Sequence, residues 1–175
     1  MREINVSELR TVAPELKCGE EILLTGTVYT ARDAAHKRFF AALEDGKELP
    51  IPIDDCVIYY CGPTPAPNGL AIGSAGPTTS TRMDKFAPRL YDMGMIATIG
   101  KGERKPEVIE AIKRNNALYL CALGGAGAIC AASIKECTVA AYDELGCESV
   151  KKLRVEKMPL FVACDVEGNS IYKSF

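Results

Sequence analysis

The sequence predicts an α/β or α+β layer fold built on a mixed sheet. Strand and helix patterns alternate through the middle of the chain, and β character marks both ends. The chain has 175 residues, 47% of them apolar and 25% charged, which is enough to bury a core and excludes disorder as the main state. We expect residues 1–175 to form a single domain.

Three elements and one loop are expected in the first half of the chain. Residues 22–29 are rich in β-branched side chains, which predicts a strand. Apolar residues then recur at intervals of four over residues 31–45, and a glycine follows, so this stretch predicts a helix. The short apolar run at residues 56–61 predicts a central strand. Residues 62–76 are rich in proline and glycine and predict a loop long enough to carry a function.

The pattern continues through residue 115 with short elements. One helical turn is expected at residues 78–84, followed by a short helix that begins at Pro88 and ends near Asp92. Residues 95–99 predict a strand. Residues 106–115 predict a helix, because a proline occupies the first turn and the apolar residues share one face.

An uncharged stretch at residues 117–134 raises the question of a membrane span, since its 18 residues reach the required length. Its glycines and alanines favour a buried strand at residues 118–123, a glycine turn and a small-residue helix over residues 125–136 instead. We therefore expect no membrane span. Residues 155–171 predict β structure with a turn at residues 167–169.

Eight cysteines are the unusual feature of the composition. No pair has C-x-x-C spacing, the one histidine is too few for the usual Cys/His zinc site, and the N-terminal residues show no signal segment. We expect reduced, mostly buried thiols in a cytoplasmic chain, and no metal held by it. The balance of 21 basic and 23 acidic residues gives no footprint for nucleic acid.

Polar clusters follow the expected strands, where open α/β sheets usually carry their sites. In the first cluster, TARDAAHKR at residues 30–38, Arg32 lies at the start of a helix, where backbone amides favour an anion. His36 is four residues later and shares the helix face with Arg32. A solvated helix face with a local Arg–Asp pair is the alternative.

The second cluster is GPTTSTRMD at residues 76–84. If Thr78 opens a helix, its hydroxyl and the Arg82 guanidinium face the same way and suit a carboxylate or phosphate. The alternative is a helix cap, although a cap needs only one of the four hydroxyls. In the third cluster, Lys101 lies between two glycines after a strand, so its amine can project from the end of the sheet. A solvated turn lysine is the alternative.

These motifs together resemble those of the iron–sulfur hydro-lyases, the class I fumarases and L(+)-tartrate dehydratases, in their β subunit or C-terminal domain. The resemblance rests on residues 25–38, residues 76–84 and the lysine loop at 100–102, in family order along nearly the whole chain. It implies a swivelling β/β/α domain, which agrees with the predicted elements. One departure is the segment before Lys101, because Ile99-Gly100 stands where many relatives have a serine.

The resemblance also implies a partner and a cofactor. In this family an α subunit, or N-terminal domain, holds a [4Fe–4S] cluster through three cysteines, and the open iron binds substrate as a Lewis acid. The β subunit supplies the other wall of the site. We expect a heterotetramer of the two subunits. Because the chain starts with its own methionine just before the first strand, we expect a separate β subunit.

Roles for individual residues follow from the same resemblance. Arg32 and Arg82 would hold the carboxylates of a small dicarboxylate substrate, Thr78 corresponds to the catalytic base, and Lys101 is a further catalytic contact. A threonine hydroxyl is a poor base, so it needs activation by Lys101 or by a carboxylate of the partner. Three residues are expected to lie behind the arginines and fix them: Asp33, His36 and Asp84.

The expected reaction is the reversible hydration of fumarate to malate, and the alternative is the dehydration of L(+)-tartrate to oxaloacetate. The motifs do not separate the two, because two arginines suit either dicarboxylate. A hypothesis of another class is a dicarboxylate-binding domain without catalysis. A self-sufficient iron–sulfur protein is disfavoured, since the sequence has no close group of cysteines.

Overall fold

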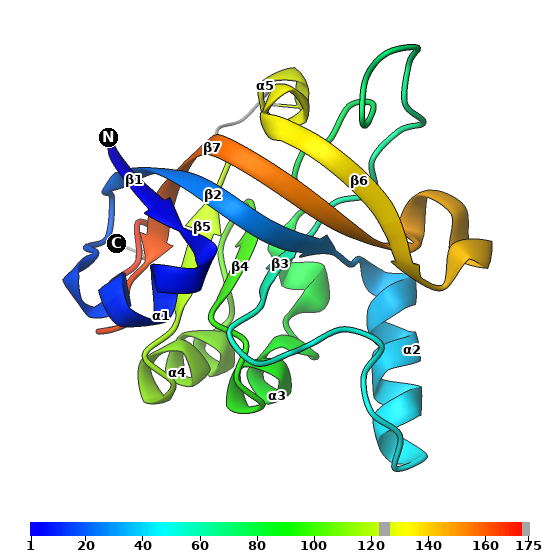
Figure 1. Ribbon diagram of the computed structural model, residues 1–175. Coiled ribbons are helices and arrows are strands. Elements are labelled where there is room, and N and C mark those ends of the chain that lie inside the picture. Colours follow the sequence, from blue (N-terminus) through cyan, green and yellow to red (C-terminus); the bar gives the residue numbers. More distant parts are fainter. Residues whose placement is uncertain (123–126, 173–175) are drawn as a thin grey trace.

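The strands of the computed structural model, which describes residues 1–122 and 127–172, form one mixed sheet (Figure 1). Within the described residues the strands are β1 (Arg2–Asn5), β2 (Glu21–Thr30), β3 (Val57–Tyr59), β4 (Ala97–Gly100), β5 (Leu118–Cys121), β6 (Ile134–Ala141) and β7 (Val150–Cys164). Their order in the sheet is β1-β2-β3-β4-β5-β7-β6. The pairs from β1 to β5 are parallel, whereas β7 is antiparallel to its neighbours. The expected α/β fold with a mixed sheet is confirmed.

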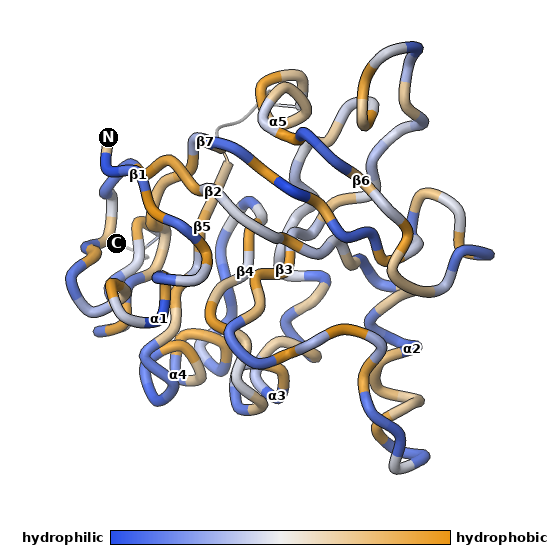
Figure 2. Tube along the Cα trace, in the orientation of Figure 1, coloured by the Kyte–Doolittle hydropathy of each residue, from blue (hydrophilic) through white to orange (hydrophobic). Residues whose placement is uncertain are grey.

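β7 closes the sheet on itself. Its last residues pair with β5, and most of its length pairs with β2, so that β2, β3, β4, β5 and β7 form a ring of paired strands. β1 and β6 are attached outside this ring, to β2 and β7. Figure 2 shows hydrophilic and hydrophobic residues alternating along β7, as is typical of a strand with one solvated face.

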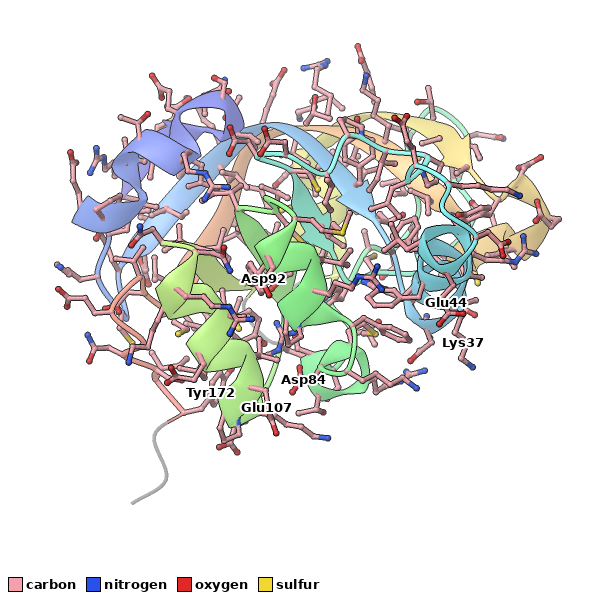
Figure 3. The ribbon with its side chains drawn as sticks, turned by 90° about the horizontal axis from the view of Figure 1, so that it is seen from below. Lys37, Glu44, Asp84, Asp92, Glu107 and Tyr172 are labelled. Atoms are coloured by element: carbon pink, nitrogen blue, oxygen red, sulfur yellow. The ribbon has the colours of Figure 1, made fainter. Side chains whose placement is uncertain are left out.

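The described helices are α1 (Leu9–Val12), α2 (Asp33–Glu44), α3 (Ala87–Asp92), α4 (Pro106–Arg114) and α5 (Gly127–Ser133), with short 3-10 turns η1 (Val6–Glu8), η2 (Ala13–Glu15), η3 (Ser80–Met83) and η4 (Asp143–Glu148). Helices α2, α3 and α4 pack on one face of the sheet (Figure 1). Side chains of α1 and α5 belong to the other hydrophobic cluster. Lys37 and Glu44 point away from the sheet on α2 (Figure 3).

Two hydrophobic clusters form because side chains alternate across each strand. Tyr59 and Leu120 belong to the cluster that also includes parts of α1 and α5. Their sequence neighbours Tyr60 and Tyr119 belong to the cluster under α2, α3 and α4, where Phe39 is fully buried. The central strands are therefore buried on both faces, which is why they read as continuous apolar runs.

The structure corrects the expected helix over residues 125–136. Helix α5 ends at Ser133, and Ile134–Ala141 forms strand β6, whose backbone pairs along β7. Most residues of β6 are exposed, and its sequence carries little apolar periodicity. The strand therefore depends on its backbone pairing with β7. The expected glycine turn at residues 124–127 and the start of that helix lie largely outside the described residues.

The two ends of the chain also differ from expectation. β1 and α1 precede residue 22, where the sequence predicted no element. At the other end, β7 begins at Val150 and ends at Cys164, so it starts earlier and stops earlier than the β structure expected over residues 155–171. No helix in residues 1–122 or 127–172 combines the length and the apolar character that a bilayer crossing requires.

Candidate functional site

Three segments meet at the carboxyl ends of neighbouring parallel strands. Arg32 follows β2, which pairs with β3. Thr78 donates its backbone N–H to the carbonyl of Tyr60, just past β3, at 2.7 Å. Thr79 forms an isolated parallel bridge with Lys101, just past β4. The topology thus brings the three polar clusters of the sequence to one edge of the sheet, as a parallel arrangement requires.

The helical turn of the second cluster begins later than expected. Helix η3 starts at Ser80, and Thr78 lies in the extended segment before it, partly buried. Thr79 occupies the cap position, but its side chain makes no capping hydrogen bond. The capping alternative therefore finds no support at Thr79. Thr78 and Arg82 do not lie on one helix, so their placement depends on the turn between them.

Arg82 is held by an ion pair with Asp33. Its Nη2 contacts Asp33 Oδ2, and the side chains are 50% and 26% exposed. Asp33 lies in the first turn of α2, directly after Arg32. The pair therefore joins the first and second clusters and is not the local pair of a solvated helix face. It brings Arg82 to the start of α2, next in the chain to Arg32, whose own ion-pair partner is Glu148.

Arg32 is the more enclosed of the two arginines, with 25% of its side chain exposed. Its Nε lies 3.8 Å from Glu148 Oε1, beyond hydrogen-bond distance, and has no hydrogen-bond partner among the described residues. A Cβ added to Gly62 would lie 2.6 Å from Arg32 Nη1, so the guanidinium packs directly against the backbone at Gly62. Donors on Arg32 are thus left for an anionic ligand.

His36 is buried within α2, and its Nδ1 lies 2.8 Å from the backbone carbonyl of Arg32. A carbonyl only accepts, so Nδ1 carries the hydrogen and donates it. Burial lowers the pKa of His36 to about 4, outweighing this hydrogen bond and the carboxylate of Asp33. Phe86 stacks on the ring at 5.3 Å. His36 is therefore neutral and contacts Arg32 through the backbone.

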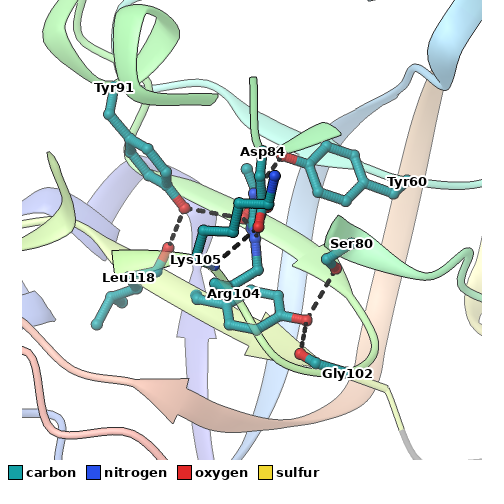
Figure 4. A network of polar contacts seen from close by, with 10 residues as sticks. Tyr60, Ser80, Asp84, Tyr91, Gly102, Arg104, Lys105 and Leu118 are labelled. Carbon is teal, nitrogen blue, oxygen red and sulfur yellow. Dashed lines mark hydrogen bonds and ion pairs between the residues drawn. The ribbon is translucent and has the colours of Figure 1, made fainter. Parts of the chain in front are cut away.

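Asp84 contacts neither Arg32 nor Arg82, unlike the expectation, because it forms a buried ion pair with Arg104. Arg104 Nε donates to Asp84 Oδ1 at 2.6 Å, and the backbone N–H of Lys105 donates to Asp84 Oδ2 at 2.8 Å (Figure 4). Sequence reasoning missed Arg104. It lies in a run of charged residues, and nothing in that run distinguishes the one buried member from its exposed neighbours.

Lys101 is exposed in a turn whose geometry accounts for the departure at Gly100. Gly102 has a φ of +84°, a backbone conformation that favours glycine. A Cβ added to Gly100 would lie 1.9 Å from Ser80 Oγ. The space beside Gly100 is therefore filled by the hydroxyl of Ser80, which comes from a different segment of the site.

The seven cysteines other than Cys18 are free thiols, and five of these seven are buried. Burial raises the pKa of Cys56, Cys61 and Cys164 to about 12, so these thiols are held in the protonated form that binds metals poorly. Within the described ranges, no three histidine, cysteine or carboxylate side chains gather as a metal site would require. The residues of this chain thus do not fit the role of cluster ligands.

Comparisons with known proteins identify the family of the chain. The family model described as "Fumarase C-terminus" matches residues 1–175. The chain is 38% identical over 169 residues to "Fumarate hydratase 2" of Leishmania major, covering 95% of this chain and 30% of that protein. It is 40% identical over 152 residues to "Fumarate hydratase class I, anaerobic" of Escherichia coli, covering 86% of this chain and 28% of that protein.

A third relative is similar along most of its own length. The chain is 38% identical over 165 residues to "Putative L(+)-tartrate dehydratase subunit beta" of Methanocaldococcus jannaschii, covering 91% of this chain and 85% of that protein. By contrast, the chain spans less than a third of the two fumarate hydratases. The similarity is therefore to one part of those enzymes and to nearly all of a subunit.

Proposed function

The chain belongs to the Fumarase C-terminus family, and we propose that it forms one wall of a hydro-lyase site for a small dicarboxylate, most directly fumarate. The observation that carries this proposal is the ion pair between Arg82 and Asp33, the residue after Arg32, which joins the two arginine segments at the carboxyl edge of the sheet. Two guanidinium groups match the two carboxylates of fumarate or malate.

Binding follows from the charges at the site. Arg32 offers guanidinium donors that the described residues leave without hydrogen bonds, and Arg82 is half exposed. Each guanidinium can bind one carboxylate, and Asp33 then keeps Arg82 oriented while the substrate approaches.

Proton transfer is assigned to Thr78. In the hydration of fumarate, water gives its hydroxyl to one alkene carbon and releases a proton, while the other alkene carbon takes a proton that we assign to the Thr78 hydroxyl. The proton released by the water then restores the Thr78 hydroxyl. In the reverse direction the Thr78 oxygen removes the proton. The positive charge of Lys101, next to the segment that carries Thr78, would favour the deprotonated hydroxyl.

The [4Fe–4S] cluster implied by the family would supply Lewis-acid activation of the added water. We assign it to a partner chain, because the buried thiols here have raised pKa values and the described residues gather no ligand group. In this proposal residues 1–175 act as a single swivelling β/β/α domain, which meets a cluster-bearing α subunit in a heterotetramer.

L(+)-tartrate is the second candidate substrate. The observation in its favour is that the similarity covers 85% of the length of the tartrate dehydratase relative, compared with 28% to 30% for the fumarate hydratases. The two arginines serve a tartrate dianion in the same way as they serve fumarate.

The test is anaerobic co-production of the chain with a cluster-bearing α subunit, followed by parallel assays with fumarate, malate and L(+)-tartrate. We expect turnover of a dicarboxylate by the complex and none by either chain alone. Activity from this chain by itself would contradict the shared site. A folded, cluster-loaded complex that turns over none of the three compounds would contradict the hydro-lyase assignment.

A further inference from the structure

Arg104 is a fully buried cation with a complete set of partners. Its guanidinium donates to Asp84 Oδ1 at 2.6 Å, to Thr98 Oγ1 at 3.0 Å and to Tyr60 Oη at 3.2 Å (Figure 4). The rings of Tyr60 and Tyr119 lie 5.3 Å and 4.8 Å from its central carbon. Neither side chain of the Asp84–Arg104 pair is more than 1% exposed.

A buried ion pair of this kind contributes little net stability. Desolvation of two charges offsets much of their attraction, and a well-packed apolar pair often serves stability equally well. The geometry of the pair is more restrictive than an apolar contact would be, because a guanidinium fork fixes both distance and direction. The Asp84–Arg104 pair therefore specifies how the two segments that carry it are placed.

Those two segments carry the proposed catalytic groups. Asp84 ends the segment of residues 78–84, two positions after Arg82. Arg104 lies in the segment of residues 100–105, three positions after Lys101. The backbone N–H of Lys105 also donates to Asp84, at 2.8 Å. The pair thus ties the arginine segment to the lysine segment from behind, out of reach of solvent.

Tyr119 makes a second tie between the same segments. Its hydroxyl lies 2.8 Å from Ser80 Oγ and 2.8 Å from the carbonyl of Gly102 (Figure 4). A phenol has one proton and a carbonyl only accepts, so Tyr119 donates to Gly102 and accepts from Ser80. The backbone N–H of Gly102 in turn donates to the hydroxyl of Tyr172 at 3.3 Å. The turn that presents Lys101 is therefore held by two tyrosines.

We propose that the Asp84–Arg104 pair and the Tyr119 hydroxyl are positioning groups, which hold residues 78–84 and 100–105 in one fixed relation so that Arg82 and Lys101 act on the same substrate. This inference rests on the proposed function, since it assigns both segments to one site. All three side chains are buried behind the site and act through Arg82 and Lys101, not on the substrate.

The test compares Tyr119→Phe and Arg104→Lys in the complex with the cluster-bearing partner. Tyr119→Phe removes one oxygen and keeps the ring beside Arg104. We therefore expect this variant to fold even if the Arg104→Lys variant fails to fold. Tyr29→Phe is the control, because Tyr29 is a buried tyrosine of β2 in the same hydrophobic cluster, and among the described residues it has no hydrogen bond to Arg104 or to either segment. Arg114→Lys is the control for an exposed Arg–Asp pair.

We expect Tyr119→Phe to lower kcat/KM about tenfold and Arg104→Lys about 100-fold, with KM raised in both, because displaced groups bind and react less well. The controls should keep the wild-type values. A merely structural role reduces the amount of active enzyme and leaves KM unchanged. A wild-type KM in Tyr119→Phe would therefore overturn the inference.

Hydrogen exchange of the full chain provides a readout that needs no substrate. Tyr119→Phe should speed exchange about tenfold in peptides covering residues 78–84 and 100–105 together, and Tyr29→Phe should not. Faster exchange in only one segment, or in neither, would overturn the tie between them. If the wild-type complex is inactive, the proposed function fails, whereas the exchange result still supports or overturns the tie itself.

Discussion

At the scale of single residues, Asp33 determines how Arg82 is presented. It follows Arg32 in the sequence and pairs with Arg82 across 49 positions, so it joins the two segments that carry the arginines of the proposed dicarboxylate site. Arg82 remains half exposed, which means that its removal takes little packing from the fold. Its contribution is therefore expected in binding and not in stability.

Arg82→Ala and Thr78→Ala should each lower kcat/KM of the complex about 10- to 100-fold, the range expected when a hydrogen bond to a charged group is lost. The free energy of unfolding should change by less than about 1 kcal/mol. Arg114→Ala, at an exposed Arg–Asp pair, is the control. Unfolding of either variant well below the wild-type temperature would favour a structural role for these residues.

Gly62→Ala tests the packing of Arg32. The added Cβ would lie 2.6 Å from Arg32 Nη1, and the end of an arginine side chain can move away at low cost. We therefore expect a raised KM with nearly wild-type stability. Gly76→Ala is the matched control in the same loop, since its Cβ would meet only an ordinary contact at 3.6 Å. Equal KM values for the two variants would contradict this placement of Arg32.

His36 predicts a pH dependence of stability. Its pKa is about 4 when folded and near 6.5 when unfolded, so the unfolded chain binds the extra proton first as pH falls. The contribution of His36 to the free energy of unfolding is complete above pH 6.5 and decreases by about 3 kcal/mol on acidification to pH 4. Chemical denaturation at several pH values measures it.

The His36→Asn variant separates this effect from that of the acidic groups, because Asn keeps a donor for the carbonyl of Arg32 and does not titrate in this range. We expect the free energy of unfolding of the variant to decrease less between pH 7 and pH 4 than that of the wild type. Parallel curves for the two proteins would show that His36 is not held neutral.

At the scale of elements, β2 pairs with three strands, β1, β3 and β7, and it is the one that leads directly into the site. Its register against β7 shifts between Leu24 and Gly26, which identifies a bulge. Gly26 has a φ of +134°, and Val6 packs against it so closely that a Cβ would lie 2.9 Å from the Cβ of Val6. The bulge allows the ten-residue strand to serve three partners before it delivers Arg32 to the site.

Gly26→Ala should destabilise the chain by about 2 kcal/mol or more, since it combines an unfavourable backbone angle with a close contact in the core. Gly19→Ala is the control, because Gly19 also has a positive φ, of +89°, but open space around its missing Cβ. The difference between the two variants in thermal or chemical denaturation isolates the packing contribution. A Gly19→Ala variant as unstable as Gly26→Ala would attribute the whole effect to the backbone.

At the scale of the whole molecule, closure of the sheet through β7 places the site at one edge. The parallel strands β2, β3 and β4 deliver Arg32, Thr78 and Lys101 to this edge, and the buried Arg104 network lies directly behind it. Five of the eight cysteines are buried, and none of those with a raised pKa lies among the proposed site residues. The proposed site residues are thus cations and a hydroxyl, which supports the proposal that a partner supplies the cluster.

Anaerobic reconstitution of the chain alone with iron and sulfide tests this division of labour. We expect the isolated chain to give much less absorbance than one bound cluster per chain would give, because protonated, buried thiols are poor ligands. The same treatment of the chain together with the α subunit should give that absorbance. A stoichiometric cluster on the isolated chain would refute the assignment of the cluster to the partner.

The sequence by itself determined the class of fold, most of the central elements and the polar clusters that meet at the site. Strands β3, β4 and β5 are buried on both faces, and α2 and α4 have local apolar periodicity, so each is visible in a short window of sequence. The three clusters were visible because each follows a strand of the parallel set. Their convergence then follows from topology.

Only the tertiary structure decided what depends on distant partners. β6 exists because β7 pairs with it, and its own sequence favoured a longer helix. Arg82 is oriented by Asp33, and Arg104 is buried by Asp84, Tyr60 and Tyr119, all from other segments. From its sequence neighbours alone, a charged residue in a polar loop is predicted to be exposed to solvent. Its burial is set by the strands and rings that fold over it, and no local pattern encodes them.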